Sequence, residues 1–229
     1  IPWAKLATQV ILGQSIKELG VQEVWPEYYS VKESVFPFNR FPTADILLSP
    51  EMKSTGEVMG IDPDFAIAFL KSQEAAGQFL PTEGTIFVTV QDRDKDAIIP
   101  YVKDLISLGF NIIATKGTAA ALDKHGISVE TLNKIADGGT TSLDLIDDGK
   151  IQLIINTVSE EGHKDAFKMR RSALSQKLPF ISTLPGLDAS IKAIKVAQST
   201  DYSVTPIQEY YKVPSGTSSS QKKMTETAI

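Results

Sequence analysis

Short apolar strands alternate with amphipathic helices through residues 84–200, and this alternation constrains the fold more than any other feature of the chain. The segment KIQLIINTV, residues 150–158, is almost continuously apolar, as is typical of a strand covered on both faces. Helical patterns at residues 94–109 and 164–178 lie between strands of this kind. The alternation predicts an α/β fold with an open parallel sheet and helices on both faces. In such sheets, ligands bind beyond the carboxyl ends of the strands.

The first 60 residues follow a different pattern. Apolar residues at helical spacing between Ala4 and Ile11 predict a helix that stops at Gly20. The stretch from residue 28 to residue 50 contains three prolines, so we expect it to be extended and loop-like, with a short strand at residues 31–36. The polar segment MKSTGEVMG, which ends this region, is interpreted as a loop.

A helix is predicted for the segment DPDFAIAFLKSQEAAG. Asp62 is its expected N-cap, Pro63 takes the first helical position, and the helix closes near Gly77. We place a domain boundary directly after it. The expected organisation is a domain at residues 1–77, a linker at residues 78–83, an α/β domain at residues 84–212 and a disordered tail at residues 213–229.

The composition excludes several classes of protein. The chain has 229 residues and no cysteine, which excludes disulfides and thiolate metal sites and fits a cytoplasmic protein. Its net charge of −5 gives no reason to expect nucleic-acid binding. It has no run of about 18 uncharged apolar residues, so we expect no membrane span. The first ten residues do not resemble a signal peptide, and we expect Ile1 to follow a cut inside a longer polypeptide.

The strongest signal of a binding site is the segment ATKGTA, residues 114–119, where a strand meets a helix. Thr115 and Thr118 place hydroxyl groups on either side of Gly117. Free N–H groups at the helix start would add donors and the positive end of the helix dipole. This combination suits a phosphate or a carboxylate. The alternative interpretation is an N-cap threonine in a tight turn.

Other strand ends add polar groups at the same edge of the sheet. Asn156 ends the strand IQLIIN with an amide, which can both donate and accept hydrogen bonds. Lys95 is expected to begin the helix after the first strand of the α/β domain, and Lys134 to end the helix after ATKGTA. We therefore predict a small-anion site formed by Lys95, Thr115, Gly117, Thr118, Lys134 and Asn156.

No catalytic or metal-binding constellation is recognisable. His125 and His163 are far apart and have no carboxylate at ligand spacing, which argues against a metal site and a catalytic triad. Neither a GxxxxGK[ST] nor a GxGxxG motif is present. Arg170 and Arg171 are adjacent on a predicted helix; one could reach an anion, but a pair of surface cations is the favoured interpretation. We assign no catalytic residue and no metal ligand.

Two long stretches resemble one enzyme family. The segment VKESVFPFNRFPTADILLSPEMKSTGEVMG, residues 31–60, resembles the end of the second ATP-grasp half of the carbamoyl-phosphate synthase large chain. The later strings ATKGTAAAL, NKI, IINTV and RRSAL resemble the C-terminal regulatory domain of that family. The resemblance implies a methylglyoxal-synthase-like α/β domain preceded by the C-terminal part of an ATP-grasp domain.

The resemblance implies that the parent protein is a cytoplasmic ligase. The family makes carbamoyl phosphate from bicarbonate, ATP and glutamine-derived ammonia, for pyrimidine or arginine synthesis. Its ATP, its Mg²⁺ or Mn²⁺ and its K⁺ bind mostly upstream of Ile1, so we expect no cofactor in this fragment and no activity from it alone. The implied partners are the glutaminase small chain, the upstream part of the large chain and further copies of the enzyme.

The family's regulatory domain binds a small effector: a nucleotide, phosphoribosyl pyrophosphate or an amino acid. By resemblance, Lys95, Thr115 and Thr118 would contact an effector phosphate. Lys134 and Asn156 would bind further along the ligand.

Three further positions match the family outside the regulatory domain. Glu33 matches the family's ornithine-contacting position. Met52 and Glu57 match positions that line the family's internal tunnel for carbamate. For Glu57, a helix cap or an ion pair with Lys53 is the structural alternative.

The chain also departs from the family pattern. Val158 replaces a threonine, and Glu160 and Glu161 stand where a basic pair is frequent, which disfavours a phosphorylated ligand. Ile181 stands where the family has an aspartate, so ornithine activation is disfavoured as well.

Two alternative functions differ in class from this one. A methylglyoxal synthase-type lyase needs a catalytic aspartate where this chain has Thr140. The other alternative is a structural domain that mediates oligomerisation and binds nothing.

Overall fold

The computed structural model describes residues 1–35, 56–132, 141–157 and 163–210, and it divides into two compact units. One unit contains residues 1–27 and the chain from Val204 onward, and the other contains residues 28–203. Across the described ranges, every helix is too short or too polar to traverse a lipid bilayer.

The first unit contains helix α1 (Trp3–Ile11), which confirms the predicted helix but not its end. The chain leaves the helix at Gly13, where φ is +101°. Beyond it, the N–H of Ser15 donates to Glu18 Oε2 at 2.9 Å in a separate turn. The prediction that one helix continues to Gly20 was therefore wrong, because a glycine with positive φ ends it earlier.

The second unit contains a five-stranded sheet in the order β5-β4-β3-β6-β7, with every neighbouring pair parallel. This confirms the open parallel sheet. The central strand β3 lies where the strand order changes direction, between β4 and β6. The strands are β3 (Thr85–Thr89), β4 (Asn111–Thr115), β5 (Glu130–Leu132), β6 (Leu153–Asn156) and β7 (Phe180–Ile181).

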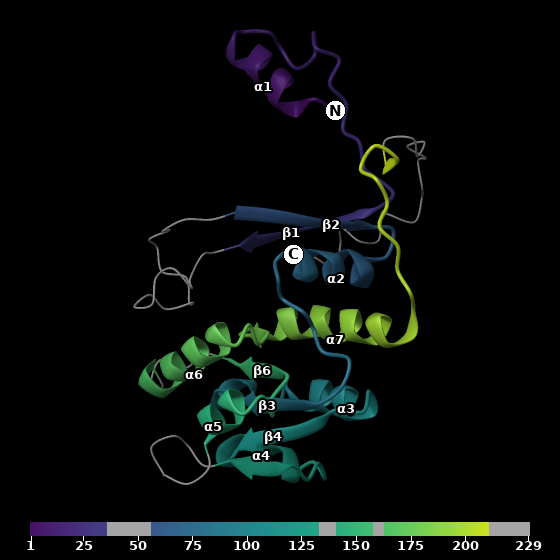
Figure 1. Cartoon of the computed structure of the whole chain (residues 1–229). Coiled ribbons are helices and arrows are strands. Elements are labelled where there is room, and N and C mark those ends of the chain that lie inside the picture. The colour runs from purple at the N-terminus through teal and green to yellow at the C-terminus, as the bar shows by residue number, and fades with distance from the viewer. Residues whose placement is uncertain (36–55, 133–140, 158–162, 211–229) are drawn as a thin grey trace. The chain divides into compact units, whose positions relative to one another are not determined.

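Helices cover both faces of this sheet, as predicted (Figure 1). On one face, Ile86, Val88 and Ile155 pack with residues of α3, α4 and α7. On the other face, Phe87 and Ile154 pack with residues of α5 and α6. The helices are α3 (Ile99–Ser107), α4 (Lys116–Asp123), α5 (Ser142–Asp147), α6 (His163–Ser175) and α7 (Leu184–Ser199).

A two-stranded antiparallel ribbon precedes the sheet. Strand β1 (Tyr29–Val35) confirms the predicted short strand, and it pairs with β2 (Gly56–Asp62). Residues 56–60, interpreted as part of a loop, are thus a strand, because their partner is a segment far away in the sequence. Helix α2 (Phe65–Ala75) lies between the ribbon and α7 (Figure 1).

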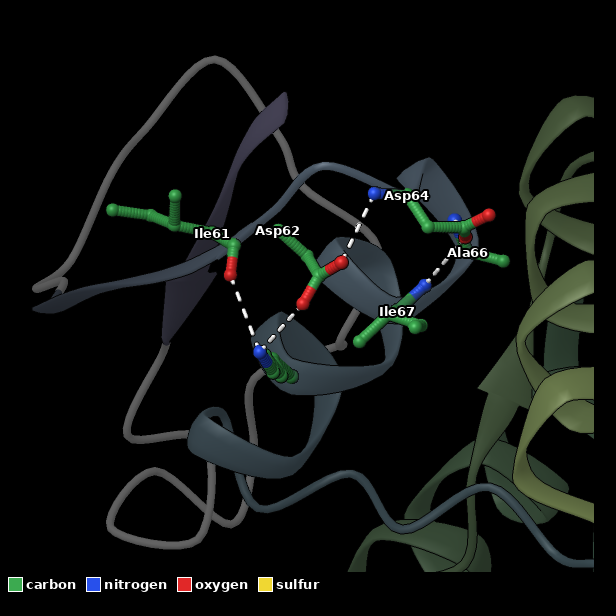
Figure 2. A network of polar contacts seen from close by, with 6 residues as sticks. Ile61, Asp62, Asp64, Ala66 and Ile67 are labelled. Carbon is green, nitrogen blue, oxygen red and sulfur yellow. Dashed lines mark hydrogen bonds and ion pairs between the residues drawn. The ribbon is translucent and has the colours of Figure 1, made fainter. Parts of the chain in front are cut away.

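The start of α2 differs by two residues from the prediction. Asp64, not Asp62, is the N-cap, and its Oδ1 accepts hydrogen bonds from Ala66 N at 2.7 Å and Ile67 N at 3.2 Å (Figure 2). Asp62 instead accepts from Asp64 N at 3.0 Å and from Lys71 Nζ at 2.8 Å. Because both aspartates flank Pro63, the spacing alone cannot tell which of them caps the helix.

We expect Asp64→Ala to lower the free energy of unfolding by about 1 kcal/mol, because two N–H groups of the first helical turn lose their acceptor. Asp64→Asn is the matched variant, since it keeps an acceptor at the N-cap and should stay close to the wild type. Equilibrium unfolding in urea measures both. Equal losses in the two variants would show that the charge matters here, not the cap.

The C-terminal end of α7 is hydrogen-bonded to the segment before the sheet and to the end of α3. Gln198 Nε2 donates to Thr82 O at 2.6 Å and to Leu108 O at 3.0 Å. The hydroxyl of Tyr202 donates a short hydrogen bond to Glu74 Oε1, and this bond raises the pKa of Tyr202 to about 12. Thr82 lies in the predicted linker, and the boundary at residues 78–83 stays a prediction.

Candidate functional site

Three polar side chains form a row across the carboxyl edge of the sheet. Thr89 at the end of β3 is in register with Asn156 on β6, and Thr115 ends the neighbouring strand β4. Two residues earlier on the same strands lie Phe87, Ile154 and Ile113, which form one apolar core cluster. Side chains two apart on a strand share a face. Thr115, Thr89 and Asn156 therefore continue that face as a polar row where the strands end.

The hydroxyl of Thr115 contacts Thr89 of the polar row and Thr118 of α4, but it does not cap the helix. It occupies the N-cap position of α4, with φ −66° and ψ 153°, yet its side chain makes no cap hydrogen bond. Its Oγ1 lies 3.2 Å from Thr118 Oγ1 and 3.4 Å from Thr89 Oγ1. The alternative interpretation is therefore confirmed for the position, since Thr115 is the N-cap residue, but its side chain leaves the first turn of α4 uncapped.

Thr118 is buried in the first turn of α4 and connects this helix to the loop after β3. Its Oγ1 accepts a hydrogen bond from Val90 N at 3.3 Å as well as from Thr115. This places the hydroxyl between the start of α4 and the loop after β3. Thr118 is therefore positioned to hold those two segments together, and its predicted contact with an effector phosphate stays a prediction.

Lys95 brings a positive charge to the start of α4. Its Nζ lies 3.1 Å from the point where a Cβ on Gly117 would stand, so the ammonium approaches the helix backbone closely. Nζ also lies 2.7 Å from Asp92 Oδ1. Lys95 follows a short 3-10 helix at Asp92–Asp94 and precedes α3 by four residues, so the prediction that it begins the helix was wrong.

Asn156 carries a buried acceptor without a partner. Only 7% of the residue is exposed, and its Oδ1 has no hydrogen-bond donor among the residues that the structure describes. A buried carbonyl oxygen left unpaired costs about 1–3 kcal/mol, so such groups call for an explanation. Asn156 ends β6 beside β3, where the strand order changes direction and where open α/β sheets bind ligands. A ligand that donates a hydrogen bond would satisfy it.

An open hollow of about 390 Å³ adjoins this edge of the sheet. Sequence reasoning did not include its residues in the site. Thr157 and Thr183 nevertheless follow the ends of β6 and β7 closely, the same signal that singled out Asn156. Within the hollow, Thr157 Oγ1 accepts from Gln91 N at 3.1 Å. The lining residues are Gln91, Arg93, Asp94, Thr157, Ser182, Thr183, Leu184 and Pro185.

The structure thus brings Lys95, Thr115, Gly117 and Thr118 together at the start of α4, with Asn156 in the adjoining polar row. Some positions that were singled out from the sequence lie outside the described residues and keep the status of predictions: Met52, Lys53, Lys134, Thr140, Val158, Glu160 and Glu161. The prediction that the helix after ATKGTA ends at Lys134 was wrong, because α4 ends at Asp123 and strand β5 follows it.

Glu33 and Glu57 belong to the separate β1–β2 ribbon. Glu33 accepts a hydrogen bond from Gln73 Nε2 at 2.9 Å, and Glu57 pairs with Lys32 at 2.9 Å. Glu57 lies within β2, so the helix-cap alternative was wrong. The ornithine contact and the tunnel-lining role stay predictions.

Arg170 is buried and not a surface cation. It lies on α6, which covers one face of the sheet, between residues of that helix that pack in the core. The interpretation of Arg170 and Arg171 as a pair of surface cations was therefore wrong for Arg170, because adjacent residues on a helix face different directions.

The fold and the polar edge define the class of this chain: it carries an α/β domain that matches the family of MGS-like domains over residues 97–182. The crystal structure of methylglyoxal synthase from Elizabethkingia anophelis superposes with a TM-score of 0.43 at 20% identity, over 58% of this chain and 93% of that one.

Relatives resemble the chain over nearly its whole length. The carbamoyl phosphate synthase large chain of Nostoc sp. is 48% identical over 212 residues, which is 92% of this chain and 19% of that one. The C-terminal section of the Methanopyrus kandleri large chain is 42% identical over 220 residues, 93% of this chain and 41% of that one. The arginine-specific, chloroplastic large chain of Oryza sativa subsp. japonica is 45% identical over 213 residues, which is 92% of this chain and 18% of that one.

The chain is therefore a homologue of carbamoyl phosphate synthase large chains and corresponds to their C-terminal part. It spans about a fifth of the length of the Nostoc relative.

Proposed function

We propose that this chain is the C-terminal part of a carbamoyl phosphate synthase large chain and that its MGS-like domain binds a small anionic effector. In the whole protein, ATP, its divalent cation and K⁺ bind upstream, and the ammonia comes from a glutaminase small chain. The complete enzyme is a cytoplasmic ligase that assembles into oligomers. The domain at residues 84–212 regulates it, for pyrimidine or arginine synthesis.

One observation carries the proposed binding function: a cation lies at the start of α4, and the polar row that begins there with Thr115 contains a buried acceptor that has no partner in the described chain. Lys95 Nζ and the first turn of α4 converge at Gly117, which is exposed. Backbone N–H groups at a helix start together with an ammonium suit an anion. Asn156 Oδ1, in the polar row, requires a donor. The ligand is therefore a small molecule that carries an anionic group and an N–H or O–H group.

Isothermal titration of the 229-residue chain with uridylate, inosinate, phosphoribosyl pyrophosphate and ornithine tests this proposal. We expect at least one of them to bind, and Lys95→Met to weaken that binding about tenfold or more, because the anion loses its charged hydrogen bond. Gly117→Ala should also weaken it, since the new methyl group would meet Lys95 Nζ at 3.1 Å and displace it.

Gly117→Ala is informative because the fold should tolerate it. The position has ordinary helical geometry, and alanine is a better helix former than glycine. Its free energy of unfolding should therefore not fall. If no ligand of the panel binds the wild type, the domain is a structural part and the proposal fails.

A further inference from the structure

The ion pair between Lys95 and Asp92 places a carboxylate of the chain at the position that the anionic group of a bound ligand would occupy. The two charged atoms lie 2.7 Å apart. Lys95 is mostly enclosed, with 26% of its side chain exposed, while Asp92 is 96% exposed. The ammonium is thus held at the start of α4, and its partner lies on the solvent side.

The neighbouring charged residues of the same loop, Arg93 and Asp94, contact other groups and not Lys95. Asp94 accepts a hydrogen bond from Gln91 Nε2 at 2.8 Å, and Arg93 Nε lies 4.0 Å from Asp94 Oδ1, with most of the Arg93 side chain exposed. Of the two aspartates in this turn, Asp92 is therefore the one that neutralises the lysine beside Gly117.

We propose that Asp92 competes with the ligand's anionic group for Lys95 and so lowers the affinity of the site for anions. This inference rests on the proposed anion site. A phosphoryl group carries more charge than a carboxylate and a third oxygen, so it can bind Lys95 and the N–H groups of the first turn of α4 together. A bound phosphoryl group therefore has to displace Asp92 from Lys95.

The exposure of Asp92 sets the size of the effect. Exposed ion pairs contribute about 0.2–1 kcal/mol, so a strong anion can displace this carboxylate. Removing the competing charge should then tighten anion binding about two- to fivefold. The gain should be at least as large for phosphate as for a carboxylate, because the same ion pair is broken in both cases and phosphate carries more charge.

Titration of the 229-residue chain with inorganic phosphate and with acetate tests the proposal, in the wild type and in Asp92→Asn. We expect the variant to bind phosphate about two- to fivefold tighter, and its affinity for acetate to rise by no larger a factor. Asp148→Asn is the control: it makes the same change in net charge at an exposed pair with Lys150, before β6, on the opposite edge of the sheet. It should leave both affinities unchanged.

Lys95→Met separates the two proposals. If Lys95→Met weakens phosphate binding while Asp92→Asn does not strengthen it, the anion site stands and competition by Asp92 is refuted. If Lys95→Met has no effect on phosphate binding, the anion site itself is wrong. In the double variant, Asp92→Asn should bring no gain once Lys95 is gone; a gain that persists would overturn the inference.

Discussion

Replacing Gly60 by alanine should destabilise the chain by about 3 kcal/mol or more. Gly60 ends the polar segment MKSTGEVMG and lies buried on β2, against helix α2. A Cβ there would stand 1.9 Å from Ala68 O and 2.6 Å from Ser72 N. Both atoms belong to the backbone of α2 and cannot move without shifting the helix. Equilibrium unfolding in urea, followed by circular dichroism, measures the loss.

Gly56→Ala is the matched control for this prediction. Gly56 lies on the same strand, and a Cβ there would come no closer than 4.0 Å to Val35. Since that is an ordinary contact distance on an exposed position, the free energy of unfolding should change by less than about 0.5 kcal/mol. If Gly60→Ala were as mild as Gly56→Ala, β2 would not pack on α2 as the structure shows.

Asn156→Leu should have two opposite effects: it should weaken effector binding about tenfold or more and raise the free energy of unfolding by about 1 kcal/mol. Leucine has nearly the shape of asparagine, and it removes a buried carbonyl oxygen that lacks a partner in the described chain. A residue that costs stability while the site is empty, and stabilises the bound state, is typical of a binding site.

Asn111→Leu is the control for the change in polarity. Asn111 starts β4, at the opposite edge of the sheet, and it is exposed. It should alter neither ligand affinity nor stability appreciably. Titration with the tightest ligand of the panel and urea unfolding give both quantities for each variant. A loss of stability in Asn156→Leu would mean that the amide has a structural partner, and the assigned binding role would be wrong.

The strands and helices of the α/β domain were predicted well where their apolar periodicity is strong. Strand β5 was missed: its three residues, Glu-Thr-Leu, carry no periodicity and form a strand because they pair with β4. Strand β2 was missed for the same reason. Residues 56–62 include two glycines and two acidic residues, and only pairing with β1 makes them a strand.

The candidate site was predicted in part. Thr115 and Asn156 were singled out because they end strands, and the structure places both in the polar row. Thr157 and Thr183 were missed, although they obey nearly the same rule, because no motif marks them. The Asp92–Lys95 pair could not be foreseen, since its importance depends on the approach of Lys95 to Gly117, a residue about twenty positions away.

The class of fold follows from the amino-acid sequence alone, because burial on both faces of a sheet requires apolar strands, and amphipathic helices must cover them. The order of the strands and their register emerge only when the chain packs in three dimensions. That register sets Thr115, Thr89 and Asn156 side by side and leaves one buried oxygen without a donor in the described chain. Such contacts join distant segments, and their energies depend on distances of a few ångströms that no local pattern specifies.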